Sequence, residues 1–183
     1  MRLTQPRILP LEISEMDEEQ RDVVERASFD KPINIHKTLA HHHKLLKRWL
    51  VFATHVLNKS TFPARERELV ILRIGWLCRA EYEWAQHAVI GKKAGLTDEE
   101  IERIKSGPDA GGWSELDKTL LRATDELKND TFISDPTWQE LKKTYDDRQM
   151  IDLIFAVGNY NLVSMALNSL GVQLDPGLKG FES

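Results

Sequence analysis

The sequence contains little cysteine and no long uninterrupted apolar segment. Cys78 is the single cysteine among 183 residues, so no disulfide can form within the chain. No apolar run reaches the roughly 18 residues that a membrane-spanning helix needs. The basic N-terminus is not followed by the apolar segment of a signal peptide. We therefore expect a cytoplasmic protein that has no membrane partner.

Positive charge is not in excess either. The chain has 25 Lys and Arg against 29 Asp and Glu, a net charge of -4. Because nucleic-acid binding depends on a basic surface, we expect no nucleic-acid partner. A local basic stretch at 36–48 is interpreted as a solvated helix face, with weak attraction of an anionic substrate as the alternative.

Signatures of cofactor and metal binding are missing as well. The chain has no glycine-rich phosphate loop, nucleophile elbow or dinucleotide-binding motif. Consecutive histidines at 41–43 would point about 100° apart on a helix and cannot converge on one ion. Glu83 and His87 supply only two possible ligands, which are too few for a metal site. We therefore expect neither a cofactor nor a metal.

Helix-start signals recur along the chain, whereas strand patterns are absent. The signals include Ser14 at the first helix and the pair Thr97 and Glu100. We predict helices at about 14–27, 34–58 (one or two helices), 63–78, 80–94, 98–105, 114–128, 135–145 and 148–170. The pattern predicts an all-α protein with a single domain, divided into an N-terminal extension (1–33), a core (34–172) and a tail (173–183).

Two of these helices are apolar on nearly every side, at 69–78 and 148–170. Such helices are normally buried. A chain of this length has few other helices to cover both of them, so we expect helix packing between the subunits of a homo-oligomer. The tail is interpreted as extended, and a partner subunit is one place where it could lie.

The stretch 68–87, ELVILRIGWLCRAEYEWAQH, ends in a group of ionisable residues. Glu83 and His87 are four residues apart, so they share one face of a helix. They could form an ordinary surface ion pair. The apolar surroundings, with Trp76, Tyr82 and Trp84, favour instead a carboxylate that orients an imidazole for proton transfer.

The segment ARERELVILRIGWLCRAEYEWAQHAVIGKKAGLTDEEIERI resembles the central part of the carboxymuconolactone decarboxylase family, which includes the alkylhydroperoxidase D-like proteins. The resemblance covers roughly 34–172. It implies an all-α helical fold, assembly as homotrimers or homohexamers, and an active site in a pocket near the subunit interface.

The peroxidase branch of this family carries the motif C-x-x-C-x-x-x-H, preceded by a relay glutamate. Aligned on His87, the cysteine positions hold Ala80 and Glu83, and the glutamate position holds Glu68. Cys78 is two residues out of register. Because thiol-based peroxide reduction needs a thiolate and a resolving thiol, the resemblance favours the decarboxylase branch.

We therefore predict a cofactor-independent lyase that acts by acid–base chemistry on a small carboxylated lactone or aromatic-catabolism intermediate. The expected roles are general acid/base for His87, orientation for Glu83, buried proton relay for Glu68 and oxyanion donor for Tyr82. Substrate contacts are expected from Arg67, Arg79 and Trp84.

Two alternatives remain open. One is a non-catalytic small-molecule binding protein on the same scaffold. The other is a peroxidase-type oxidoreductase that uses Cys78 alone.

Overall fold

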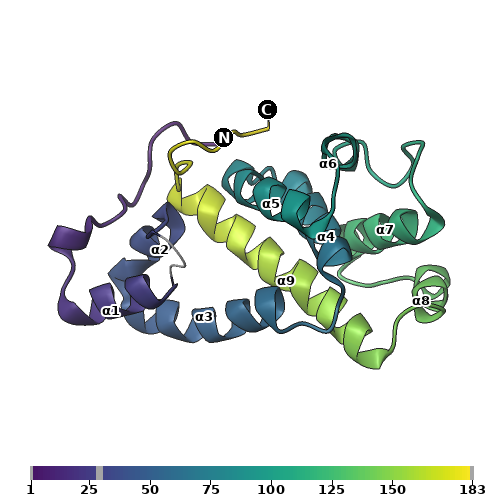
Figure 1. The fold of residues 1–183 in the computed structure, drawn as a ribbon, viewed down its shortest axis with the longest axis horizontal. Coiled ribbons are helices and arrows are strands. Elements are labelled where there is room, and N and C mark those ends of the chain that lie inside the picture. Colours follow the sequence, from purple (N-terminus) through teal and green to yellow (C-terminus); the bar gives the residue numbers. More distant parts are fainter. Residues whose placement is uncertain (1, 28–30, 182–183) are drawn as a thin grey trace.

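The computed structural model describes residues 2–27 and 31–181, and throughout this part of the chain the regular elements are helices (Figure 1). They are η1 (Ile13–Glu15), α1 (Glu18–Ala27), α2 (Asn34–Leu39), η2 (Ala40–His42), α3 (His43–Asn58), α4 (Ala64–Leu77), α5 (Glu81–Ala94), α6 (Asp98–Ile104), α7 (Glu115–Asp130), α8 (Asp135–Lys142) and α9 (Asp147–Leu170). The all-α prediction is confirmed.

Local sequence signals define most helix starts. Thr97 and Glu100 exchange the two hydrogen bonds of a capping box at the start of α6, as predicted. At α1 the reciprocal bonds join Asp17 and Gln20. The first helix therefore begins after Asp17, and the cap predicted at Ser14 is wrong.

Glycines end two of the long helices. Gly95 after α5 has φ 108°, and Gly171 after α9 has φ 72°. Glycine adopts this left-handed conformation without the steric cost of a Cβ. Both predicted ends are confirmed.

Helix α4 forms the centre of the larger core. Its residues from Glu68 to Gly75 are all buried, and it packs against α5, α6, α7 and α9. A helix surrounded in this way needs apolar residues on every side. The sequence prediction of a central helix in this stretch is confirmed.

The helices form two groups, with α9 running diagonally between them (Figure 1). Helices α1 to α3 enclose a small core that includes Met16, Val24 and Leu46. Helices α4 to α9 enclose the larger one. A third cluster, with Ile35 from α2 and Leu167 from α9 among its members, connects the two groups.

Only part of α9 is buried. By length and composition alone this helix could cross a membrane, although polar residues such as Asp152 and Asn159 interrupt its apolar sequence. Half of its apolar window is buried inside the chain.

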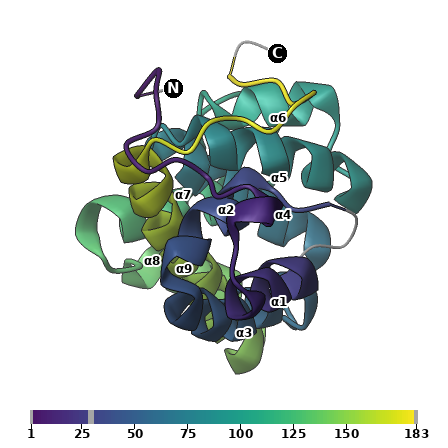
Figure 2. The ribbon, with the colours of Figure 1, turned by 90° about the vertical axis from the view of Figure 1, so that its left-hand side faces the viewer.

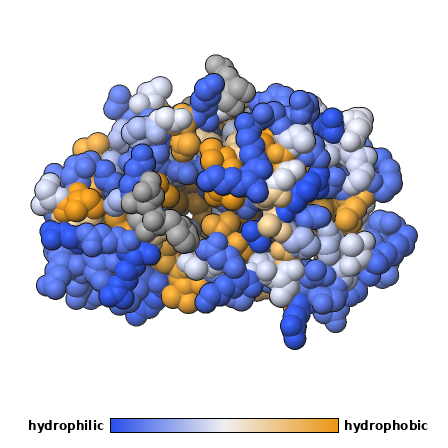
Figure 3. Space-filling view, viewed as in Figure 1, coloured by the Kyte–Doolittle hydropathy of each residue, from blue (hydrophilic) through white to orange (hydrophobic). Residues whose placement is uncertain are grey.

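The exposed face of α9 is also apolar. It carries Ile151, Phe155, Gly158, Leu162 and Met165, which we call the α9 stripe. Phe52 of α3 continues the stripe through an edge-to-face contact with Phe155. Figure 3 shows exposed apolar residues at several places on one face of the molecule, including around a hollow near its middle.

Both terminal segments pass the end of α9 (Figure 2). The backbone N–H of Arg7 donates to the carbonyl of Leu170, and the side chain of Gln173 donates to the carbonyl of Leu3. The tail as far as Phe181 lies on its own chain. Contact of the tail with a partner subunit stays a prediction.

Candidate active site

His87 of α5 lies between two buried carboxylates. Its Nδ1 is 2.6 Å from Oε2 of Glu68 on α4, and its Nε2 is 2.9 Å from Oε1 of Glu83. Glu83 precedes His87 by one helical turn, so this contact follows from the sequence spacing. Glu68 reaches the ring because α4 and α5 pack side by side. The exposed fractions are 0% for Glu68, 4% for Glu83 and 5% for His87.

This arrangement favours a protonated ring. A neutral imidazole has one N–H, so one of the two contacts would place a ring lone pair against a carboxylate oxygen. Burial by itself lowers the pKa of His87. The charges of Glu68 and Glu83 and their hydrogen bonds outweigh burial and raise that pKa to about 10.

Arg67 completes the charge balance of the site. Its Nε lies 3.7 Å from Oε1 of Glu68, and its side chain is 11% exposed. Two carboxylates thus face two cations, Arg67 and the protonated His87. Buried charges are tolerated when they are matched in this way.

The ring of Tyr160, on α9, packs against the ring of His87. The two rings meet edge to face, with centroids 4.7 Å apart and planes at 79°. Burial, followed by the negative charges of Glu83 and Glu68, raises the pKa of Tyr160 well above its usual range, so its hydroxyl keeps its proton. Sequence analysis missed Tyr160, because the approach of α9 to α5 leaves no local signal.

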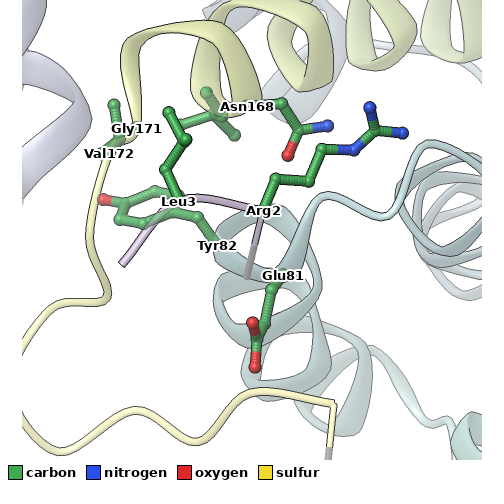
Figure 4. A pocket seen from close by; sticks show the side chains of 8 residues that line it. Arg2, Leu3, Glu81, Tyr82, Asn168, Gly171 and Val172 are labelled. Atoms are coloured by element: carbon green, nitrogen blue, oxygen red, sulfur yellow. The ribbon is translucent and has the colours of Figure 1, made fainter. Parts of the chain in front are cut away.

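Tyr82 points elsewhere. Its hydroxyl donates to Oδ2 of Asp175 at 2.5 Å and accepts the backbone N–H of Ile35. The ring belongs to the cluster that joins α2, α5 and α9. It lines a small indentation between the N-terminal segment and the end of α9 (Figure 4). The structure therefore does not bring Tyr82 together with the His87 group.

Trp84 and Arg79 also lie outside that group. Trp84 is 1% exposed and packs on Trp76 and Phe181 in the core. Arg79 is an exposed residue with φ 52° between α4 and α5. Among the expected substrate-binding residues, Arg67 is the one that contacts the buried carboxylates.

The two positions that hold cysteine in the peroxidase motif are occupied here by an alanine and a glutamate. Ala80 is fully buried just before α5, and Glu83 contacts His87. Cys78 is buried at the end of α4, where its Sγ donates to Oδ1 of Asn161. In the described part of the chain no second cysteine lies near it.

No group of His, Cys, Asp and Glu in the described residues is arranged to hold a metal ion. In the His87 group the reason is geometric, because the two carboxylates contact opposite nitrogens of the ring. Those nitrogens point away from each other, so the carboxylates and the ring cannot share one ion.

Two hollows of the described surface lie away from His87. One is the indentation beside Tyr82, and the other lies on α6 between Asp98 and Ser106. Glu68, Glu83 and His87 line neither of them, and all three side chains are buried in the single chain.

Sequence comparison identifies the family of the central part. Residues 43–126 match the model of the Carboxymuconolactone decarboxylase family. A comparison with curated proteins finds no match.

Solved structures share the fold at low sequence identity. An uncharacterised peroxidase-related protein with an alkylhydroperoxidase AhpD core, from Ralstonia eutropha JMP134, is 12% identical, with a TM-score of 0.81 and 93% of each chain covered. A peroxidase-related protein from Silicibacter sp. TM1040 is 14% identical, with a TM-score of 0.79 and coverage of 95% of this chain and 96% of that one.

A third similar structure is that of a debrominase, whereas the first two are peroxidase-related proteins. It is a variant of the debrominase Bmp8 in complex with 2,3,4-tribromopyrrole, 11% identical, with a TM-score of 0.76 and 94% of each chain covered. At these identities the similarity establishes the fold and not the activity. The family match over residues 43–126 and the shared fold together support a relation of the chain to the carboxymuconolactone decarboxylase/AhpD-like family.

Proposed function

We propose that the protein is a cofactor-independent acid–base lyase for a small carboxylated lactone or a related aromatic-catabolism intermediate. The observation that carries this proposal is His87 held between two buried carboxylates, Glu68 and Glu83, where the peroxidase motif would have a thiol. Such a group stores a proton in a low-dielectric site. Without a thiol pair, proton transfer is the chemistry that these residues support.

The reaction needs one proton. The bond between the substrate carbon and its carboxylate breaks, CO₂ leaves, and the electron pair remains as a dienolate until carbon is protonated. Both nitrogens of the protonated His87 are engaged, so we assign the final transfer to Glu83: Nε2–H of His87 passes its proton to the Glu83 carboxylate, and Glu83 delivers that proton to the carbon. The ring is then neutral, with its remaining proton on Nδ1 toward Glu68, and a proton from solvent returns to Nε2 by way of Glu83.

The other expected residues receive different roles. The hydroxyl of Tyr82 already donates a hydrogen bond to Asp175, and Trp84 is a core residue. We therefore assign both of them to the scaffold. Arg67 balances the charge of the site, and Arg79 lies at the surface, where it is available to attract an anionic substrate.

The test is to follow CO₂ release from γ-carboxymuconolactone and related carboxylated lactones. We expect Glu83→Gln and His87→Ala to lower kcat/KM by about a hundredfold or more, the usual size of a general acid contribution. Cys78→Ala is the control and should leave the rate unchanged. Absence of turnover, or full activity in His87→Ala, would exclude the proposed mechanism.

A second candidate is a small-molecule binding protein on the same scaffold. The burial of Glu68, Glu83 and His87 in the single chain favours this candidate. Side chains buried in this way would also be found if the ion cluster only stabilised the fold and took no part in a reaction. A thermal-shift screen separates the two. A ligand at about a hundred times its dissociation constant stabilises by roughly 2.7 kcal/mol, and a binding protein would not consume it.

The peroxidase-type alternative has less support. Cys78 is 7% exposed, its thiol donates to Asn161, and the chain has no second cysteine. Peroxide consumption that Cys78→Ala abolishes would establish this alternative. A thiol that does not react in the native protein would exclude it.

We also propose that the chain assembles with copies of itself through the α9 stripe. Gly158 lies at the middle of the stripe, seven residues from both Ile151 and Met165, and a Cβ there would meet nothing within 4 Å. Two antiparallel copies crossing at Gly158 would therefore pair apolar residues along their whole length. Such a two-fold contact exists in a hexamer built from trimers but not in an isolated cyclic trimer.

We place this activity in the cytoplasm. A lone cysteine suits a reducing compartment, because disulfides persist mainly in oxidising ones.

A further inference from the structure

Two buried polar atoms of the site have no hydrogen-bond partner among the described residues. They are Oε1 of Glu68 and Nε of Arg67. The two atoms are 3.7 Å apart, which is beyond hydrogen-bonding distance. The site therefore holds an unused acceptor beside an unused donor.

Neighbouring contacts hold the two atoms apart. Glu68 is bound to Nδ1 of His87 through its other oxygen at 2.6 Å. Arg67 donates from Nη1 to the carbonyl of Phe62 at 3.4 Å. Since buried polar groups are nearly always satisfied in folded proteins, an atom from outside the chain is expected to contact both of them from one side.

The hydrogen-bonding character of the two atoms indicates which chemical group could contact both. A carbonyl oxygen would accept from Arg67 but leave Glu68 unpaired, and an ammonium would donate to Glu68 but be repelled by Arg67. A carboxylate would pair with Arg67 but lie against the negative charge of Glu68. A hydroxyl oxygen both accepts and donates, so it satisfies the two atoms together.

We infer that Arg67 and Glu68 form a subsite for a hydroxyl group of the substrate, with Nε of Arg67 as donor and Oε1 of Glu68 as acceptor. This assignment rests on the proposed function in taking the His87 group as the substrate site. It narrows the substrate to a hydroxylated lactone or cyclic acid. It also replaces the expectation that Arg67 binds the substrate carboxylate, since Glu68 is too close.

The test compares two neutral probes that differ in a single hydroxyl group. α-Hydroxy-γ-butyrolactone and γ-butyrolactone are titrated into the full-length protein, and dissociation constants are measured from NMR chemical-shift changes. We expect the hydroxylated lactone to bind about tenfold more tightly or better, because a site built for a hydroxyl leaves polar atoms unpaired when the hydroxyl is missing.

Variants assign the preference to the two residues. Arg67→Gln should reduce the preference to about twofold or less, because the remaining amide cannot reproduce the charged donor. Arg67→Lys keeps the positive charge but lacks Nε, so it should also reduce the preference for the hydroxylated lactone. This second variant provides the test if Arg67→Gln does not fold. Arg48→Gln, an exposed position on α3, is the matched control and should keep the wild-type preference.

Equal binding of the two lactones, or no binding of either, would overturn the inference. The outcome is separable from that of the proposed function. CO₂ release without a hydroxyl preference would support the lyase and exclude the subsite. A hydroxyl preference without CO₂ release would support the subsite and exclude the lyase.

Discussion

At the scale of residues, His87 links the candidate site to the stability of the fold. Its pKa is raised from 6.5 to about 10 by two carboxylates that outweigh burial. The folded state therefore binds its proton more tightly than the unfolded state does. The stabilisation is complete below about pH 6.5 and is lost as the pH rises through about 10.

The loss of stability with rising pH gives the first prediction. Between pH 6.5 and 10, the difference in unfolding free energy between wild type and His87→Gln should shrink by at most about 1.4 kcal/mol per pH unit. Urea unfolding at several pH values measures it. Titrating groups that do not contact His87 are common to both proteins and cancel in the difference. A difference that stays constant over this range would mean that His87 is not protonated in the folded protein.

Gly107 provides the second prediction. It has φ 84°, and a Cβ there would lie 2.7 Å from Nη2 of Arg73. Arg73 cannot move aside, because it forms paired bonds to Asp125 and donates to the carbonyl of Ile104. Gly107→Ala should therefore lower the free energy of unfolding by about 2 kcal/mol or more.

The control for Gly107→Ala is Gly177→Ala. Gly177 has φ 88°, but a Cβ there would meet nothing within 4 Å. The control thus carries the backbone strain without the clash. Thermal unfolding that shows equal losses in the two variants would exclude a contribution from Arg73.

At the scale of elements, Asp175 joins three parts of the chain. Its Oδ1 accepts the backbone N–H of Asn34 at the start of α2, and its Oδ2 accepts from Tyr82 and Gln86 of α5. The aspartate is 8% exposed. It therefore holds the C-terminal tail against α2 and α5 and satisfies a free N–H of a helix start.

The third prediction concerns this connection. Asp175→Ala should destabilise the protein by about 3 kcal/mol, because it leaves buried donors unpaired. Asp175→Asn keeps an acceptor and should cost less. Urea unfolding measures both effects, with Asp109→Ala as an exposed control. A loss in Asp175→Ala no larger than in the control would mean that the tail is not held through this residue.

At the scale of the whole molecule, the α9 stripe is the feature that a single chain leaves unexplained. Leu162 and Met165 are 53% and 55% exposed on a helix whose other face is in the core. Continuous apolar surfaces of this kind usually mark interfaces. The comparison structures show the fold and do not decide the assembly.

The fourth prediction tests the proposed assembly. Leu162→Lys should lower the mass measured by light scattering at micromolar concentration, because it places a charge in the apolar contact. Phe132→Lys is the matched control, since Phe132 is also exposed, at 63%, but lies outside the stripe. An unchanged mass in Leu162→Lys would exclude the α9 stripe as the interface, as would a monomeric wild type.

The sequence by itself determined the helices and the contacts within them. Capping residues and glycines define helix ends through local hydrogen bonds and backbone freedom, as Thr97 and Gly95 do. The meeting of Glu83 with His87 follows from helical periodicity. The absence of a thiol pair likewise follows from the amino-acid sequence alone, because the chain has one cysteine.

Only the tertiary structure decided which helices meet. Glu68 reaches His87 across the α4–α5 contact, and Tyr160 reaches it from α9. Tyr82, although it lies beside Glu83 in sequence, turns toward the tail. Neighbouring residues on a helix point about 100° apart, so which of them faces a site depends on how the helices pack.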